Sequence, residues 1–363
     1  MNFQEAKAAW EAHSAIHEQN GAYFPGAQSY LPDEYRNNFS LAMDAQPALS
    51  TTTNGGIPAY LTYWTDPKVF KVLFAPNKAA TILGEVRKGS LTDTTALFPT
   101  VEHTGEISSY DDFAENGRTG VNTVFPQRQN YIGQTMKEYG DLELERAGLA
   151  RINWVSELDV AAATVVNKFL NLSYVFGIGT VLQNYGMSND PALNASLTPA
   201  PKAYGGVKWV NNGQIVATAG EVYADIQALY LQLVIQTGSL VEEDSEMVLV
   251  VPTQAGVALT ATNSFNVNVS DLLKKNFPKL TIETMVQYNA YSASNPQGIQ
   301  GGNFVQLIVK SIDGQETGYA AFSEKMRAGR IIPATSSFKQ KVSFGTWGAI
   351  IRQPANLASM IGV

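Results

Sequence analysis

Hydrophobic positions between residues 141 and 174 recur at steps of three or four, the spacing of one face of an α-helix. The apolar stripe consists of Leu149, Ile152, Val155, Leu158, Ala162, Val165, Phe169 and Leu172. No proline falls between Pro126 and Pro191. The pattern predicts one helix of about 30 residues, roughly 45 Å long, that closes on a turn at residues 184–191. The alternative is two shorter helices that follow one another.

The segment before this helix predicts a long two-stranded β-ribbon at residues 92–133. Its parts are the arms Thr94–His103 and Val121–Ile132, the interruptions Pro99 and Pro126, and a tip with Asp111, Asp112 and the turn-forming pair Asn116-Gly117. Prolines inside the arms suit exposed strands better than the centre of a sheet. Because an isolated two-stranded ribbon is marginally stable in water, this one needs a neighbouring surface, either on another copy or on its own domain.

The segment after the helix alternates between short strands and helices. The predicted elements are a strand around Val207–Val210, a capping box at Thr218–Glu221 with a helix up to Gly238, a strand at Met247–Val251, a helix at Ser270–Lys275, and strands at Leu280–Val286 and Phe304–Val309. This order predicts an α/β unit with its own core. Alternating apolar and polar positions from Phe338 to Arg352 predict a long, half-exposed closing strand.

The first 66 residues read as an arm with one short helix, whose apolar side carries Phe3, Ala6 and Trp10. Frequent proline and glycine then make a compact domain improbable. The arm holds seven acidic and two basic residues, a net charge of −5. Since cationic groups supply nonspecific nucleic-acid affinity, direct DNA binding by this arm is not expected.

Composition adds few constraints. The chain has 363 residues, 45% of them hydrophobic and 16% charged, and a net charge of −7. Low charge indicates either a surface largely covered by partners or a large core. The absence of cysteine excludes disulfides and thiolate sites. No signal-peptide pattern and no run long enough to span a membrane occurs, so a cytoplasmic origin is expected.

The candidate chemistry is sparse. His13 and His17 stand four residues apart on a helix, but no third ligand has a useful spacing, so no metal is expected. The carboxylates at Asp111-Asp112 and at residues 242–244 fall in predicted turns, where water solvates them. No phosphate-binding glycine loop and no nucleophile elbow occurs, and the chain has three histidines. The sequence therefore predicts no catalytic residue, no cofactor and no enzyme.

The order of these elements resembles the major capsid proteins of tailed bacteriophages with the Hong Kong 97 fold. The turn Gly186-Met187-Ser188-Asn189-Asp190-Pro191 is similar to a turn common in that family. The closing segment at residues 348–354 is similar to the final strand of the family. The resemblance implies an α+β fold with an N-arm at 1–66, an extended loop at 88–136, a peripheral domain with a spine helix at 137–217 and 336–363, and an α/β axial domain at 218–335.

The resemblance also implies a function. Copies of the chain would form hexamers and pentamers of an icosahedral shell that is assembled in the host cytoplasm and encloses packaged viral DNA without sequence-specific binding. Scaffold, portal and decoration proteins are possible partners, and no membrane is involved. Some family members join the loop to a neighbour through a lysine–asparagine bond, but no lysine lies between Lys88 and Lys137 here, so a shell without covalent crosslinks is expected.

Two alternatives stand beside the viral shell. One is an encapsulin, a cellular nanocompartment of similar fold that encloses a cargo enzyme. The other is a carbohydrate-active enzyme or sugar-binding module, which 16 tyrosines and 5 tryptophans would suit.

If the chain forms a shell, charges on the ribbon and on the start of the spine helix should meet a neighbouring subunit. The candidate interface residues are Asp111, Asp112, Phe113, Arg118 and Arg128 on the ribbon, Glu143 and Arg146 on the helix, and Arg352 on the closing strand.

Overall fold

The computed structural model describes residues 77–363, except for 150–151, 180–182 and 294. The chain divides into two units, Met1–Val72 and Leu73–Val363, and the description below concerns the second. The predicted arm, its short helix and the pair His13 and His17 lie outside the described residues.

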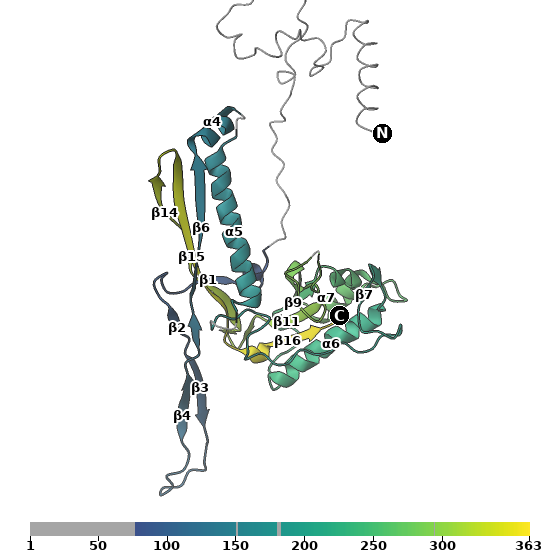
Figure 1. Cartoon of the computed structure of the whole chain (residues 1–363). Helices are drawn as coiled ribbons and strands as arrows, with labels where there is room; N and C mark the ends of the chain where they lie inside the picture. Colours follow the sequence, from purple (N-terminus) through teal and green to yellow (C-terminus); the bar gives the residue numbers. More distant parts are fainter. Residues whose placement is uncertain (1–76, 150–151, 180–182, 294) are drawn as a thin grey trace, which may run out of the picture. The chain divides into compact units, whose positions relative to one another are not determined.

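The first sheet of the described unit has the strand order β1-β14-β15-β6. Its strands are β1 (Glu85–Arg87), β14 (Gly318–Pro333), β15 (Ser337–Ile351) and β6 (Tyr131–Gly140). One face is covered by α5 (Trp154–Phe176), where Phe169 stacks on Tyr131 and packs against Phe344 of β15 (Figure 1). The short helix α3 (Ala79–Leu83) joins the same core.

The predicted single helix is wrong, and the two-helix alternative is correct. The helices are α4 (Asp141–Leu149) and α5, and the side chain of Asn153 caps the second by accepting a hydrogen bond from the Ser156 amide at 3.3 Å. The predicted apolar stripe is only partly buried: Ala162 is buried, whereas Val165 is 56% and Leu149 87% exposed.

The second sheet confirms the predicted α/β unit. Its order is β10-β9-β11-β16, with β10 (Leu280–Met285), β9 (Met247–Pro252), β11 (Phe304–Val309) and β16 (Leu357–Ile361). The helices α6 (Ala219–Gln236) and α7 (Val269–Asn276) and the turn η3 (Ala255–Thr260) share one core cluster with it. The predicted capping box is present, since Thr218 and Glu221 each bond the backbone of the other.

Short elements complete this unit. They are β7 (Val210–Asn211), β8 (Gln214–Ile215), η4 (Val286–Tyr288), β12 (Ser311–Ile312), β13 (Gln315–Glu316) and η5 (Pro354–Asn356). The strand expected around Val207–Val210 is therefore shorter and begins later. Among the described helices, none is long and apolar enough to cross a membrane.

The closing strand differs from its prediction. β15 alternates only in its first part, and from Phe344 to Ile351 every residue is buried. Trp347 and Ile350 belong to one core cluster and Ala349 to another, so this part is covered on both faces. The strand is not the last one either, because β16 follows it.

The sheet pairings cross the predicted domain boundaries. β14 falls in the segment predicted as axial, 218–335, but pairs with β15, while β16 falls in the segment 336–363 but pairs with β11. Each predicted segment thus contributes to both sheets. The division into peripheral and axial domains stays a prediction.

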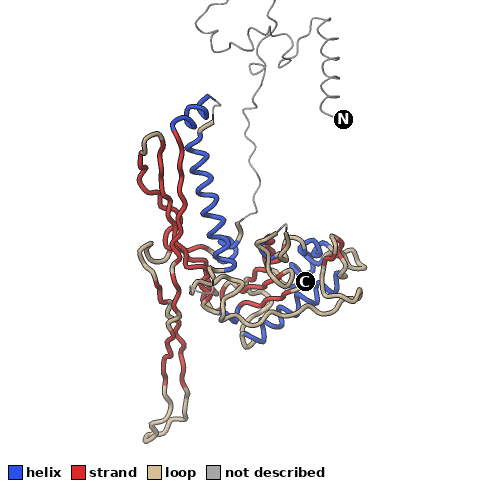
Figure 2. Tube along the Cα trace, viewed as in Figure 1, coloured by secondary structure: helices blue, strands red, loops and turns tan. Residues whose placement is uncertain are grey.

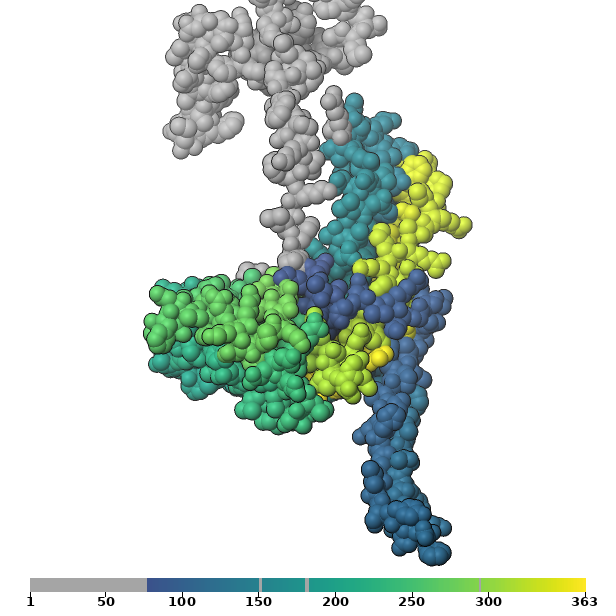
Figure 3. Space-filling model, turned by 180° about the vertical axis from the view of Figure 1, so that it is seen from behind, coloured from purple at the N-terminus to yellow at the C-terminus, as the bar shows by residue number. Residues whose placement is uncertain are grey.

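The two-stranded ribbon is confirmed. We call residues 95–129 the ribbon; it contains the pairs β2 (Thr95–Leu97) with β5 (Gln127–Gln129) and β3 (Thr100–Gly105) with β4 (Thr119–Val124) (Figure 2). Every residue of β3 and β4 is exposed, and Figure 3 shows the ribbon in blue with no other described part over this side of it. A loop at 106–118 joins the two strands, so Asn116-Gly117 does not close the hairpin as a two-residue turn.

Candidate assembly surfaces

The turn at residues 184–191 closes the C-terminal end of α5. A helix leaves its last carbonyl groups without partners, and here the turn supplies the donors. The Met187 amide donates to the Tyr174 carbonyl at 2.8 Å, and the Ser188 amide and hydroxyl donate to Val175 at 3.1 and 2.5 Å. The side chain of Asn189 donates to the Phe176 carbonyl at 2.5 Å.

Glycine at position 186 is required by this close approach. A Cβ atom there would lie 2.3 Å from the backbone carbon and oxygen of Val175. The Gly186 amide instead donates to the side-chain oxygen of Asn189 at 2.8 Å. The motif that carried the family resemblance is thus a helix-ending structure with a physical reason for its glycine and asparagine.

The same turn holds the base of the ribbon. Arg128 of β5 forms an ion pair with Asp190 at 2.8 Å, with the two side chains 11% and 1% exposed, and its guanidinium lies 5.0 Å from the ring centre of Tyr185. The Asn184 side chain donates to the carbonyls of Gln129 at 3.1 Å and of Thr346 at 2.9 Å. Arg128, a candidate for contact with a neighbour, therefore has its charge partner inside the chain.

The tip of the ribbon presents apolar side chains on a hydrogen-bonded loop. Ile107, Tyr110 and Phe113 are at least 91% exposed. The Asp111 carboxylate accepts a hydrogen bond from the Phe113 amide at 3.4 Å, and the Tyr110 hydroxyl donates to Asp112 at 2.7 Å. The hydrogen bond to Asp112 raises the pKa of Tyr110, because it stabilises the protonated hydroxyl. The predicted candidates Asp111, Asp112 and Phe113 thus lie together on one small surface.

The remaining candidates lie apart from this tip along the chain. Arg118 is exposed at the start of the returning strand, and its carbonyl accepts a hydrogen bond from the Glu106 amide at 3.0 Å. Glu143 accepts a hydrogen bond from the Gly140 amide at 3.2 Å, and Arg146 is exposed on the same helix, α4. The Arg352 guanidinium donates to the Tyr319 hydroxyl at 3.2 Å and stacks on its ring at 5.1 Å. Their contact with a neighbour stays a prediction.

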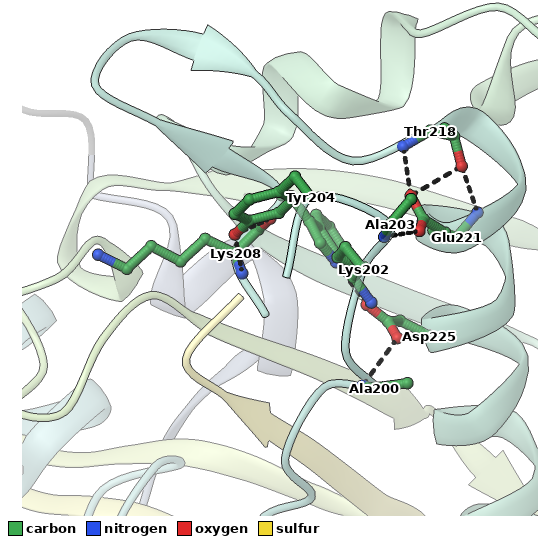
Figure 4. A network of polar contacts seen from close by, with 9 residues as sticks. Ala200, Lys202, Ala203, Tyr204, Lys208, Thr218, Glu221 and Asp225 are labelled. Atoms are coloured by element: carbon green, nitrogen blue, oxygen red, sulfur yellow. Dashed lines mark hydrogen bonds and ion pairs between the residues drawn. The ribbon is translucent and has the colours of Figure 1, made fainter. Parts of the chain in front are cut away.

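A buried polar network was missed by the sequence analysis, because its members are far apart in the chain and follow no known motif. Lys202 and Asp225 form an ion pair at 2.5 Å with side chains 1% and 3% exposed, and the Trp209 indole donates to Asp225 at 2.6 Å. Figure 4 shows Lys202 and Asp225 meeting beside α6. Because Asp225 is a residue of α6, the pair fastens the segment around Lys202 and Trp209 to this helix.

A second carboxylate of α6 holds the same segment from its exposed side. Glu221 accepts hydrogen bonds from the amides of Thr218 at 2.7 Å and Ala203 at 2.6 Å, and these bonds lower its pKa. Both carboxylates are committed to structural contacts. Among the described residues, no group of three histidine or acidic residues could hold a metal ion.

Comparisons with known proteins give one family and one fold. A model of the family described as Pa193 gp26 major capsid protein matches residues 48–362. Among solved structures, the chain is similar to the capsid of Myoviridae phage XM1, with a TM-score of 0.66 and 15% identity over 85% of this chain and 100% of that one. It is also similar to the capsid of a native GTA particle, with a TM-score of 0.55 and 11% identity over 88% and 100% of the chains. A Gordonia phage Cozz structure gives a TM-score of 0.54 and 8% identity over 87% and 98%. A comparison with curated protein sequences gave no match.

Proposed function

The chain belongs to the family of the Pa193 gp26 major capsid protein, and from this membership we propose that its copies form hexamers and pentamers of a phage head that encloses packaged DNA. As a member, it is the major capsid protein of an icosahedral head, a structural component of the virion that associates with copies of itself and is not an enzyme. The predicted family, the α+β capsid fold and the role as a major capsid protein of an icosahedral phage head are confirmed. The family match favours the viral shell over the cellular nanocompartment and the sugar-binding alternative.

We retain the division into an extended loop at 88–136, a peripheral domain and an axial domain as part of this proposal. Two separate sheets support it: α5 covers one face of the first, and the second shares a core cluster with α6 and α7. Scaffold, portal and decoration partners, and assembly in the host cytoplasm, stay predictions.

The observation that carries the proposal is the ribbon. Its two central strands are exposed on both faces although they bear Val101, Val121 and Val124, and its tip exposes Ile107 and Phe113. Within the described part of the chain these apolar side chains stay exposed, and an isolated ribbon of this kind is only marginally stable in water. Contact with another copy, repeated head to tail, would bury them and would close a ring.

Within this proposal, Phe113 is the central apolar anchor of the ribbon. Large aromatic side chains near the centre of an interface commonly supply most of its binding energy. Asp111 and Asp112 flank this anchor in the chain and, with Arg118 at the start of the returning strand, would set its orientation through charge. Glu143, Arg146 and Arg352 are exposed elsewhere and would make secondary contacts.

Electron microscopy and light scattering of the expressed chain test the proposal. We expect closed particles from the native sequence and mostly unassembled chains from Phe113→Ser combined with Ile107→Ser. Phe265→Ser is the matched control, because Phe265 is 85% exposed but lies outside the ribbon. A native chain that remains monomeric, or a ribbon variant that assembles as well as the control, would contradict the proposal.

The absence of covalent crosslinks gives a second test. Some members of the family crosslink through a lysine of the extended loop, and the ribbon contains no lysine. We therefore expect purified particles, boiled in detergent, to run as a single band at the mass of one chain on a denaturing gel. A ladder of higher bands would refute this part of the proposal.

A further inference from the structure

A pocket of about 640 Å³ lies on the exposed side of α6, where the loop after this helix and the end of α7 border it. Tyr223 and Tyr230 of α6 line it from positions two turns apart on one face of the helix. Ala224 and Ala228 lie between them, and their small side chains leave the space open. The volume falls in the usual range of ligand sites in proteins.

The polar groups of this pocket offer acceptors and one negative charge. Among the described residues that line it, Glu243 alone is charged, and its carboxylate forms no ion pair with any described residue. The side-chain nitrogen of Asn276 donates to the Tyr223 hydroxyl at 2.5 Å, so its oxygen remains as an acceptor. Lys274 and Lys275 of α7 are exposed and do not line the pocket. The arrangement therefore suits a ligand that donates hydrogen bonds and is positively charged.

The aromatic wall lies close to the negative charge. Tyr230 packs against Phe277, with the two ring centres 4.9 Å apart. Burial raises the pKa of Tyr230, and the charges of Glu243 and Glu242 raise it further, because they disfavour a second negative charge beside them. The electrostatic potential at this ring is thus negative, and the face of an aromatic ring itself attracts cations.

The chain already holds one guanidinium with the same two components. Arg128 lies 5.0 Å from the ring centre of Tyr185 and forms an ion pair with Asp190 at 2.8 Å. The pocket on α6 likewise combines tyrosine rings with a carboxylate, but no cation of the described residues lines it. A guanidinium suits both components, because its plane stacks on aromatic rings and its N–H groups can donate two parallel hydrogen bonds to one carboxylate.

We infer that this pocket binds a guanidinium group, which comes either from a free guanidino compound or from an arginine side chain of a neighbouring copy. Glu243 would accept the N–H groups, a tyrosine ring would stack on the plane of the cation, and the space over Ala224 and Ala228 would admit its alkyl chain. The second source rests on the proposed function, because it requires that copies assemble. The first source does not.

Saturation-transfer NMR tests the binding, because it detects weak ligands on large particles. The probe is N-acetyl-arginine methylamide, and the control ligand is N-acetyl-citrulline methylamide, which has nearly the same shape without the charge. Both are added to particles of the native chain and to the unassembled variant Phe113→Ser with Ile107→Ser. We expect signal transfer to the side-chain methylene groups of the arginine probe and little or none to those of the neutral analogue.

Three substitutions change the pocket in different ways. Glu243→Gln removes its charge and should weaken binding of the arginine probe by about tenfold. Gln227→Glu adds a second carboxylate to the lining and should strengthen binding, which a damaged fold could not do. Ala228→Phe fills the space and should abolish binding. The matched controls, Glu316→Gln and Ala161→Phe, change exposed positions outside the pocket and should bind as the native chain does.

The two forms of the protein distinguish the two sources. Binding to unassembled chains and to particles supports the inference and assigns a free compound. Binding to unassembled chains alone supports it and assigns the arginine of a neighbouring copy, which would already fill the pocket in particles. Equal binding of the neutral analogue, undiminished binding by Ala228→Phe, or no binding to either form overturns the inference. A native chain that forms no particles would contradict the proposed function, while the measurement on unassembled chains would still decide the inference.

Discussion

Removing the amine of Lys202 should destabilise the unit built on the second sheet by about 3–5 kcal/mol, the usual cost of leaving one charge of a buried ion pair without its partner. Asp225 is 3% exposed, so its carboxylate cannot recover water. In Lys202→Met, the Asp225 carboxylate would still accept two hydrogen bonds, one from the Trp209 indole at 2.6 Å and a longer one from the Ala200 amide at 3.4 Å. Two neutral donors do not replace a cation at 2.5 Å.

The double variant Lys202→Met with Asp225→Asn separates the buried charge from the packing. It removes both charges while the amide oxygen of the new asparagine still accepts from Trp209. We expect it to be more stable than Lys202→Met alone by about 1–3 kcal/mol, because an unsatisfied neutral amide costs less than an unpaired carboxylate. Lys279→Met is the control, because its pair with Asp244 at 3.1 Å is largely exposed and should contribute at most about 1 kcal/mol.

Urea unfolding of the full chain, followed by circular dichroism, measures these free energies. Hydrogen exchange supplies a local readout in assembled particles, because the Lys202 amide donates to Gly206 at 2.7 Å and should lose protection in Lys202→Met. A single variant within about 1 kcal/mol of the native chain, or a double variant less stable than the single one, would refute the reasoning.

Two further predictions concern the core around α5. Gly186→Ala should destabilise the chain by about 1–3 kcal/mol or more in urea unfolding, because its Cβ would lie 2.3 Å from the backbone of Val175. Gly220→Ala is the control: this glycine of α6 has open space around its Cβ and no positive φ, so the substitution should not destabilise the chain, and equal losses would contradict the reasoning. Burial raises the pKa of Tyr174 and of Tyr288 above the value of about 10 in the unfolded chain. Both tyrosines therefore contribute fully to the free energy of unfolding below about pH 10, and this contribution is lost as the pH rises towards their pKa values in the folded chain. Tyrosinate absorbance should therefore show two tyrosines that ionise only together with unfolding, and ionisation of every tyrosine near pH 10 in a folded chain would contradict this.

The α/β unit could be predicted from the sequence because its signals are local. The strand Phe304–Val309 has the predicted bounds, and the capping box at Thr218 and Glu221 marks the start of its helix. A continuous apolar run and a four-residue capping pattern both depend on neighbours in the chain, which the sequence displays directly.

The break between α4 and α5 was missed although a local signal existed. Leu149 and Ile152 keep the helical spacing across the break, so hydrophobic periodicity alone continues through it. Asn153, a favoured N-cap residue directly before an apolar segment, marked the true start of α5. Likewise, the segment Phe344–Ile351 contains no charged residue, which is typical of a strand covered on both faces, whereas the alternation of apolar and polar residues holds only in the first part of β15.

Arg128 shows what the sequence could not supply. The sequence predicts Arg128 as an exposed charge on the ribbon. Its partner, Asp190, is 62 residues away in the chain and lies in the turn that ends α5. No spacing rule connects the two, since their meeting depends on how the ribbon base, the turn and β15 pack. The sequence places Asp190 and Asn184 in a turn, and only the three-dimensional structure shows their contacts with the ribbon base.

The ribbon therefore has a fixed base and a free tip. At its base, Arg128, Asn184 and Gln129 tie β5 to the end of α5 and to β15 through buried contacts. Beyond that base, among the described strands, β3 and β4 pair only with each other, and the tip exposes its apolar side chains. Since a rigid base limits the directions in which the tip can point, less conformational freedom would be lost when Phe113 binds another copy. In the proposed assembly, the buried Arg128–Asp190 pair would orient the contacting surface of the tip without itself touching a neighbour.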